Sequence, residues 1–395
     1  MPELFAADTA SALHVARMSA PLRILHVAES FATGVAGVVT PLSEHLLDAG
    51  HSVAIAYGVR PETPADVRGD LSEQIELFPL PWRRRTPREQ LSAGGALRRV
   101  ARHWKPDVVH LHSSFAGVVG AAALGHDYTL VYSPHGYSFT RSSDSAVRRR
   151  AYREAERYVA RHVNVVAAVS ESEAAQARAA IDAPAVEVVP NGIPELDPGA
   201  LPNVPERDRV RVVGMGRANQ QRRPEAVGRI LSRVSDVADV EWIGGGMPGD
   251  TGTQILEAHG VTVTGWLGQE EAGERLAEAT AYLHWSAWDG RSLAVLEAMA
   301  RDVVVVASDI PANREVLDEE QVCDSEHEAV RLLHAVATDE SVRERLLEAQ
   351  RARRSAFSAL GMATQWEHVY ERLAHRTETG MILAPEAESD VYSAP

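Results

Sequence analysis

The chain has 395 residues, which is more than one hydrophobic core usually serves, so two domains of ordinary size are expected. Hydrophobic residues make up 45% and charged residues 24%, a balance typical of globular proteins that argues against extended disorder. A formal net charge of −15 argues against a general nucleic-acid binder, and the single cysteine, Cys323, excludes an internal disulfide.

Nothing in the sequence indicates a membrane span or a signal peptide, and one cysteine fits a reducing compartment, so a cytoplasmic protein is expected. Of the 40 basic residues, 39 are arginine and Lys105 is the only lysine. Residues 83–161 hold 15 basic and 6 acidic side chains, a net charge of +9. This stretch is either a contact for anionic lipid at the inner face of the plasma membrane or a set of solvated helix faces.

Short apolar runs alternate with longer amphipathic stretches along the whole chain, the pattern of parallel sheets covered by helices. In the first half, strands are predicted at 23–28, 52–57, 108–112, 129–133, 165–170 and 186–189, with helices at 40–49, 94–103 and 145–161. In the second half, strands are predicted at 211–215, 240–243, 261–264, 281–285 and 303–308. Helices are predicted there at 225–234, 270–278, 293–301, 326–337, 339–354 and 362–373.

The boundary between the halves follows from turn-forming residues. Pro190-Asn191-Gly192 ends one strand, and residues 194–205 are rich in proline and glycine without periodicity, which predicts a linker. We therefore expect two domains, at 21–197 and 208–361, with an extension at 1–20 and a flexible acidic tail at 378–395.

Three segments carry candidate chemistry. The first lies between the first strand and a helix expected to begin near Gly37, where a glycine turn at Gly34 would expose backbone N–H groups to an anion. The same residues are also explained by a tight turn that binds no ligand.

In the second segment a strand ends at Gly216, and Arg217 and Arg222 follow just past its carboxyl end. Open α/β sheets bind their ligands at this edge, and an arginine side chain can bind a phosphate through two hydrogen bonds.

The third segment, 285–299, is the most informative. Asp289 precedes a turn at Gly290, and Glu297 follows eight positions after Asp289, inside a predicted helix. The first turn of this helix would direct backbone N–H groups at a diphosphate, Glu297 would accept hydrogen bonds from ribose hydroxyls, and Asp289 would reach sugar hydroxyls. In the alternative interpretation, both acids are local caps or ion-pair partners. The residues that this loop and the start of the helix would place against such a ligand are Gly290, Arg291, Ser292, Leu293 and Ala294.

The D-x7-E pattern of Asp289 and Glu297 resembles the E-x7-E signature of the retaining glycosyltransferases of family 4. These enzymes have the GT-B fold, in which two Rossmann-like doubly wound parallel-sheet domains face a central cleft. The resemblance covers nearly the whole chain and is strongest to the bacterial subgroup that builds capsule, O-antigen and exopolysaccharide. Further matching stretches are 26–31, 110–114, 132–139, 168–173, 189–192, 221–224, 242–244, 263–267 and 307–309.

The resemblance implies a role for each domain and for the candidate residues. The first domain, 21–197, would lie on the acceptor side and include the C-terminal helix at 362–377, and the second, 208–361, would bind the nucleotide sugar. His135 would lie beside the transferred sugar, and Arg217 and Arg222 would neutralise the diphosphate. Asp289 would contact the sugar of the donor, and Glu297 would contact its ribose. Gly265 and Trp266 would lie near the nucleobase. The remaining contacts with the donor would come from Gly216 and from the backbone of Gly34.

Three departures from the family pattern bear on the donor sugar. The glycine pair that the family has near Ala32 and Thr33 is reduced to Gly34. The first acid is usually glutamate, so Asp289 is one methylene shorter. The loop usually continues Gly-Leu-Pro, where this chain has Gly290-Arg291-Ser292.

No metal is expected. His110 and His112 end a strand without carboxylates at ligand spacing, and no Asp-x-Asp occurs in the chain to hold a diphosphate-bound cation. Strand-end packing is the expected role of these two histidines.

The expected reaction is transfer of a sugar, with retention, from a nucleoside diphosphate sugar (UDP in preference to GDP) to a hydroxyl. The acceptor would be a sugar, a lipid-linked sugar or a small molecule, in synthesis of cell-surface polysaccharide or glycolipid, with no cofactor. A UDP-sugar 2-epimerase of the same fold and a non-catalytic sugar-binding subunit of a polysaccharide assembly complex are the alternatives.

Overall fold

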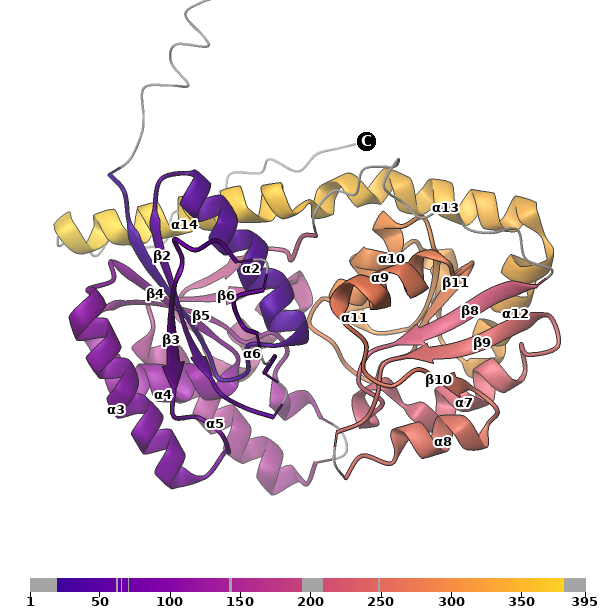
Figure 1. Ribbon diagram of the computed structural model, residues 1–395, viewed down its shortest axis with the longest axis horizontal. Helices are drawn as coiled ribbons and strands as arrows, with labels where there is room; N and C mark the ends of the chain where they lie inside the picture. The colour runs from indigo at the N-terminus through magenta and orange to yellow at the C-terminus, as the bar shows by residue number, and fades with distance from the viewer. Residues whose placement is uncertain are drawn as a thin grey trace, which may run out of the picture.

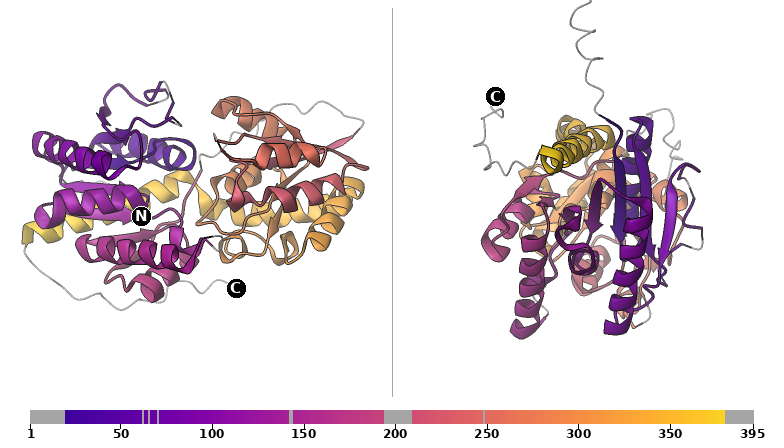
Figure 2. Two further views of the ribbon diagram at one scale, coloured as in Figure 1. Left: turned by 90° about the horizontal axis from the view of Figure 1, so that it is seen from below. Right: turned by 90° about the vertical axis from the view of Figure 1, so that its left-hand side faces the viewer.

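The computed structural model describes residues 20–61, 63–64, 66–69, 71–141, 144–193, 209–247 and 249–379. The expected extension up to residue 19, the linker at 194–205 and the tail from residue 380 lie outside these residues. The described chain forms two parallel-sheet domains side by side (Figures 1 and 2). The predicted fold class, two Rossmann-like α/β domains, is therefore confirmed.

The first domain is built on a seven-stranded parallel sheet in the order β3-β2-β1-β4-β5-β6-β7. Because the order runs outward from β1 in one direction and from β4 in the other, the sheet is doubly wound and has its switch point between these strands. Its strands are β1 (Arg23–Ala28), β2 (Ser52–Gly58), β3 (Glu76–Leu80), β4 (Val108–His112), β5 (Thr129–Ser133), β6 (Val165–Ala168) and β7 (Val186–Val188).

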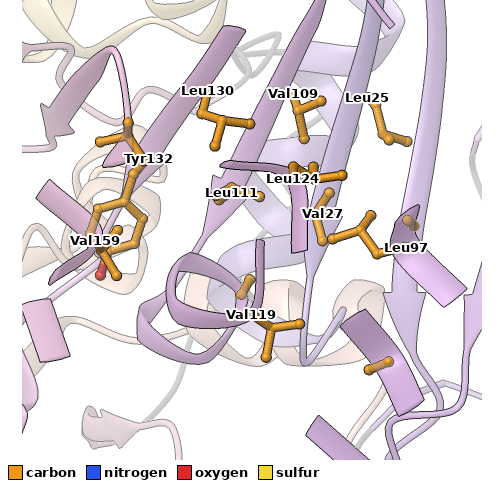
Figure 3. Close-up of a cluster of buried hydrophobic side chains, with 14 of the residues drawn as sticks. Leu25, Val27, Leu97, Val109, Leu111, Val119, Leu124, Leu130, Tyr132 and Val159 are labelled. Carbon is orange, nitrogen blue, oxygen red and sulfur yellow. The ribbon is translucent and has the colours of Figure 1, made fainter. Parts of the chain in front are cut away.

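Helices cover both faces of this sheet. One face packs against α3 (Pro87–Trp104), α4 (Ser114–Leu124), α5 (Ala146–His162) and α6 (Glu171–Ile181) in a core that contains Leu25 and Val27 of β1 (Figure 3). The other face packs against α2 (Thr33–Asp48) and α14 (Ala359–Thr379), in a core that contains Ile24 and Ala28. Successive residues of β1 therefore point to opposite faces, as a strand buried on both sides requires.

The second domain contains a six-stranded parallel sheet in the order β10-β9-β8-β11-β12-β13. Its strands are β8 (Val210–Met215), β9 (Ala238–Ile243), β10 (Thr262–Val263), β11 (Ala281–His284), β12 (Val304–Ser308) and β13 (Val322–Cys323). One core gathers α7 (Pro224–Ser232), α8 (Gly252–Ala258), α12 (Glu326–Thr338) and α13 (Glu340–Arg354). The opposite core gathers α9 (Gln269–Ala277) and α10 (Leu293–Ala300) and is flanked by the short helix α11 (Pro311–Arg314).

The chain returns to the first domain at its C-terminal end. Ile193 and Ser358 form a parallel bridge, and Ala359 donates its N–H to the Ile193 carbonyl at 2.7 Å. Helix α14 then packs over the first domain (Figure 1), where Trp366 and Tyr370 are buried in the core shared with α2. The two strands of backbone that join the domains are thus hydrogen-bonded to each other.

The sequence prediction missed several elements, among them α6, α8 and β13. For two others, the reason can be identified. Strand β3 contains Pro79, which sequence rules discount in a strand, but β3 lies at the edge of the sheet, where proline is tolerated. Helix α4 is apolar on all sides, so it lacks the amphipathic period that predicts a helix. Within the described part of the chain, no helix is both long and apolar enough to span a membrane.

Candidate active site

In the second domain, Arg222 and Asp289 meet at the carboxyl ends of β8 and β11. Nη1 of Arg222 donates to Oδ2 of Asp289 at 2.8 Å and to Oγ of Ser286 at 2.5 Å, and it lies 3.2 Å from Nε2 of His284. Burial acts against the charge of Asp289, but the nearby Arg222 and a hydrogen bond from His284 outweigh it, so the pKa of Asp289 lies well below its usual value. Arg222 therefore lies in the site as the cation of a partly buried ion pair.

Arg217 is engaged elsewhere. Its Nε and Nη2 contact the two carboxylate oxygens of Asp250 at 2.7 and 3.2 Å. Asp250 also accepts the N–H of Met247 at 2.9 Å. The two arginines predicted to bind one diphosphate are thus held by different carboxylates in this structure.

Helix α10 begins where the sequence predicts. The side chain of Ser292, at its N-cap, forms no capping hydrogen bond. The half-buried carboxylate of Glu297 forms no hydrogen bond with a described residue, and burial raises its pKa, an effect that Arg301 opposes. The first turn of α10 and Glu297 therefore both have unused hydrogen-bonding capacity.

The expected glycine turn at Gly34 is wrong. Helix α2 begins at Thr33, so Gly34 lies exposed within its first turn, and no side chain caps this helix either. A Cβ atom on Gly37 would lie 2.8 Å from Cδ1 of Leu293 at the start of α10. The amino ends of one helix from each domain therefore lie against each other. Both direct partial positive charge toward the domain junction.

The turn after β5 brings His135 to the same junction. His135 has φ +52° and Gly136 has φ +97°, so the chain reverses sharply at the end of the strand. A Cβ atom on Gly290 would lie 3.2 Å from the Gly136 nitrogen and 3.4 Å from Oε1 of Glu173. The loop that follows Asp289 in one domain thus touches the turn that holds His135 in the other.

The side chain of Arg291 is occupied by an ion pair at the domain junction. Its Nη2 contacts Oε2 of Glu315 at 3.0 Å, and its side chain is only 5% exposed. The carboxylate of Glu315 in turn accepts the N–H groups of Glu171 and Ser172, at 2.9 and 2.8 Å, at the start of α6 in the first domain. We therefore expect Arg291 to reach a donor only through its backbone.

Trp266 offers an exposed aromatic face at the carboxyl end of β10. Its indole is 49% exposed, and Nε1 donates to the Gly246 carbonyl at 3.2 Å. The preceding Gly265 has φ +75°, which allows this turn. A planar base could stack on the exposed ring.

A cluster of histidines lies behind His135, and sequence reasoning did not foresee it. One nitrogen from each of His26, His110 and His112 lies within 4.8 Å of the others, which is close enough for a metal site. The sequence argument against a metal was that no carboxylate lies near these histidines. That argument alone does not exclude a metal site, because three histidine nitrogens lie close together. The nitrogens are hydrogen-bonded instead: Nδ1 of His26 to Nε2 of His112 at 3.1 Å, and the two nitrogens of His110 to Tyr370 and Ser133.

Glu173 was also missed, although Ser170-x-x-Glu173 is a capping signature that could have drawn attention to it. The buried carboxylate accepts the N–H groups of Gly136 and Val169 at 2.6 and 2.8 Å. Burial raises the pKa of Glu173 to about 7, although these two hydrogen bonds lower it.

We expect Glu173 to make the stability of the protein depend on pH. Its folded pKa of about 7 lies above the ordinary value of 4.5, so between these values the native state binds more protons than the unfolded state. The stabilising contribution is complete below the lower value and is lost as the pH rises to the higher one. Melting temperatures between pH 5 and pH 8 should therefore fall more steeply in the wild type than in Glu173→Gln. Parallel curves would contradict this prediction.

Comparison with known proteins gives the following matches. Residues 32–195 match the model of Glycosyltransferase Family 4, and residues 200–347 match the model of glycosyl transferases group 1. An uncharacterised 41.2 kDa protein in the cps region of Klebsiella pneumoniae is 25% identical over 315 residues, which are 75% of this chain and 84% of that protein.

Two solved structures show the same fold. Sucrose-phosphate synthase from Thermosynechococcus elongatus superposes with a TM-score of 0.76 at 17% identity, over 89% of this chain and 99% of that one. HepE of Anabaena, in complex with UDP and glucose, gives a TM-score of 0.72 at 16% identity, over 89% of this chain and 100% of that one.

Proposed function

This chain is a family-4 type glycosyltransferase with the GT-B fold, and on that premise we propose that it transfers a sugar from UDP to a hydroxyl with retention at the anomeric carbon. The observation that carries the proposal is the junction itself. There, the Arg222–Asp289 pair, the uncapped start of α10 and the His135 turn come from opposed strand ends. Such a place suits a ligand with a diphosphate at one end and a sugar at the other.

Departure of the diphosphate creates negative charge, and groups already aimed at it lower the barrier. In the proposed complex, Arg222 and the N–H groups at the start of α10 supply the positive potential, so no metal is required. Arg222 must then share its guanidinium between Asp289 and a phosphate oxygen. Asp289 holds the arginine in place until the donor arrives and afterwards accepts a hydrogen bond from a sugar hydroxyl.

The exposed ring of Trp266 supports a nucleobase site, and HepE was solved with UDP. A thermal-shift titration tests this. UDP at about a hundred times its dissociation constant should stabilise the protein by about 2.7 kcal/mol, and GDP at the same concentration should stabilise it less. Trp266→Ala should weaken UDP binding about tenfold or more through lost stacking, with the ligand-free melting temperature unchanged because the ring is half exposed. Equal shifts by UDP and GDP would count against a uridine site.

Transfer is tested with the purified protein, a panel of UDP-sugars and acceptors, and NMR of the product's anomeric proton. A product with the donor's anomeric configuration supports retention, and an inverted product overturns it. Incubation with UDP-sugars alone separates the rival activity, because a 2-epimerase needs no acceptor. No reaction on either panel despite UDP binding would favour a non-catalytic subunit.

For the acceptor we propose a lipid-linked sugar for cell-surface polysaccharide or glycolipid at an anionic membrane surface. The relative in the cps region is compatible with that role. On α5, a hollow of about 440 Å³ is lined by Ala146, Glu154 and four arginines, Arg149, Arg150, Arg153 and Arg157, of which Arg157 is paired with Glu154 at 2.7 Å. The neighbouring Val147 is 80% exposed. Leu91 on α3, which covers the same face of the sheet, is also 80% exposed. Arginines beside exposed apolar side chains suit a surface that inserts shallowly among anionic headgroups.

Co-sedimentation with vesicles tests the membrane contact. Binding should rise with the fraction of anionic lipid and fall in Val147→Asp. A matched change on the opposite face of the domain, Leu360→Asp at a residue 67% exposed, should leave binding unchanged. Vesicle binding that does not change with the fraction of anionic lipid would contradict this part of the proposal.

A further inference from the structure

Three histidines form a hydrogen-bonded chain from the interior of the first domain to the domain junction. His26 lies on β1, His112 at the end of β4 and His135 just after β5, so three neighbouring strands each supply one imidazole. Nδ1 of His26 lies 3.1 Å from Nε2 of His112. Nδ1 of His112 lies 3.0 Å from Nε2 of His135. The same order of nitrogens is thus repeated at both contacts.

All three imidazoles are neutral near pH 7. Burial lowers the pKa of His26 to about 3 and that of His135 to about 4. The pKa of His112 also lies well below its usual value, mainly through burial and then through the neighbouring histidines. A neutral imidazole has one N–H donor and one acceptor nitrogen. Three rings therefore share three protons, and two of these protons lie within the two hydrogen bonds.

The third proton must sit at one end of the chain, on Nε2 of His26 or on Nδ1 of His135. His26 is fully buried, and its Nε2 has no hydrogen-bond partner among the described residues. A buried N–H without an acceptor is rare, because it gives up its hydrogen bond to water and gains nothing in return. Nδ1 of His135 escapes this cost, since the residue is only half-buried and lies at the junction.

We propose that His26 and His112 are positioning residues that hold His135 in the tautomer with its proton on Nδ1. His135 then offers a hydrogen-bond donor to a ligand at the junction and cannot act there as a base. The ligand in question is the sugar donor of the proposed function, on which this part of the inference rests. An N–H at this place would bind an oxygen of the transferred sugar or of the leaving phosphate.

The tautomer can be read without any substrate, by NMR of the full-length protein with 15N-labelled histidine. His135, assigned by the signals lost in His135→Asn, should show the Nδ1–H pattern, unchanged between pH 6 and pH 8. In His112→Leu the same residue should exchange between tautomers. In the control Tyr370→Phe, which removes only the hydroxyl 2.7 Å from Nδ1 of His110, His135 should keep the wild-type pattern.

Two results would overturn the proposal: the Nε2–H tautomer at His135 in the wild type, or a stoichiometric metal in the purified protein that is lost when His112 is replaced.

The turnover number provides a second readout. The turnover number of His112→Leu should fall about tenfold, because His135 offers its donor only part of the time. Asparagine, which adopts φ values near +52° readily and places an amide N–H near the Nδ1 position, should replace His135 better than leucine does. Equal activity of these two variants would contradict the donor role. A protein with the expected tautomer but no transferase activity would refute the proposed function and leave the histidine chain standing.

Discussion

Arg222→Ala should lower the turnover number by a factor on the order of 100 to 1000, the usual effect of removing one group that stabilises charge in the transition state. The structure adds a second consequence. Asp289, only 14% exposed, would be left without its cation, and because breaking a fully buried pair costs about 3–5 kcal/mol of folding free energy, this partly buried pair should cost less than that. Turnover should therefore be measured at a temperature where the variant is still folded, as checked by circular dichroism.

The chain offers a matched control for this variant. Arg211 is also on the β8 side of the second domain, is similarly buried (15% exposed against 17% for Arg222) and also contacts carboxylates, those of Glu241 and Glu278. It lies near the amino end of β8, away from the site. Arg211→Ala should lower stability comparably and leave the turnover number within about twofold of wild type. If both variants lose the same activity per folded molecule, Arg222 has only a structural role.

Trp366→Ala should lower the free energy of unfolding by about 3–5 kcal/mol, the cost of emptying the site of a large aromatic side chain in a core. Trp366 is 3% exposed and packs against His110, with ring centroids 4.4 Å apart, and against Tyr370. The loss is a large part of the roughly 5–15 kcal/mol that a domain has in total. We expect this loss of stability in the first domain, although Trp366 comes after the second domain in the sequence.

Leu360→Ala serves as the comparison, because Leu360 lies on the same helix and is 67% exposed. It should change stability by no more than about 0.5 kcal/mol. Urea denaturation monitored by tryptophan fluorescence and circular dichroism measures both. Similar losses in the two variants would mean that α14 is not part of the first domain's core.

Several elements of the site could be predicted because their signals are local. The spacing of Asp289 and Glu297 follows from one turn and one helix, and the position of Arg222 follows from the end of one strand. The structure places each of them at a strand's carboxyl end or within α10, as the sequence predicts. That Arg222 and Asp289 form an ion pair could not be predicted, because they are 67 positions apart and meet only through the pairing of β8 with β11.

The sequence alone determined the alternation of strands and helices, the division into two domains and the residue types available for binding a phosphate, since these depend on short-range periodicity and on turn residues. Only the tertiary structure decided which groups are already occupied: Arg217 by Asp250, Arg291 by Glu315, and His135 by a chain of histidines that begins at His26. It also decided that Glu173 and Glu315 lie at the junction. The physical reason is that charge and hydrogen bonding depend on distance in space. In a doubly wound sheet, the loops that share one edge come from strands far apart in the chain.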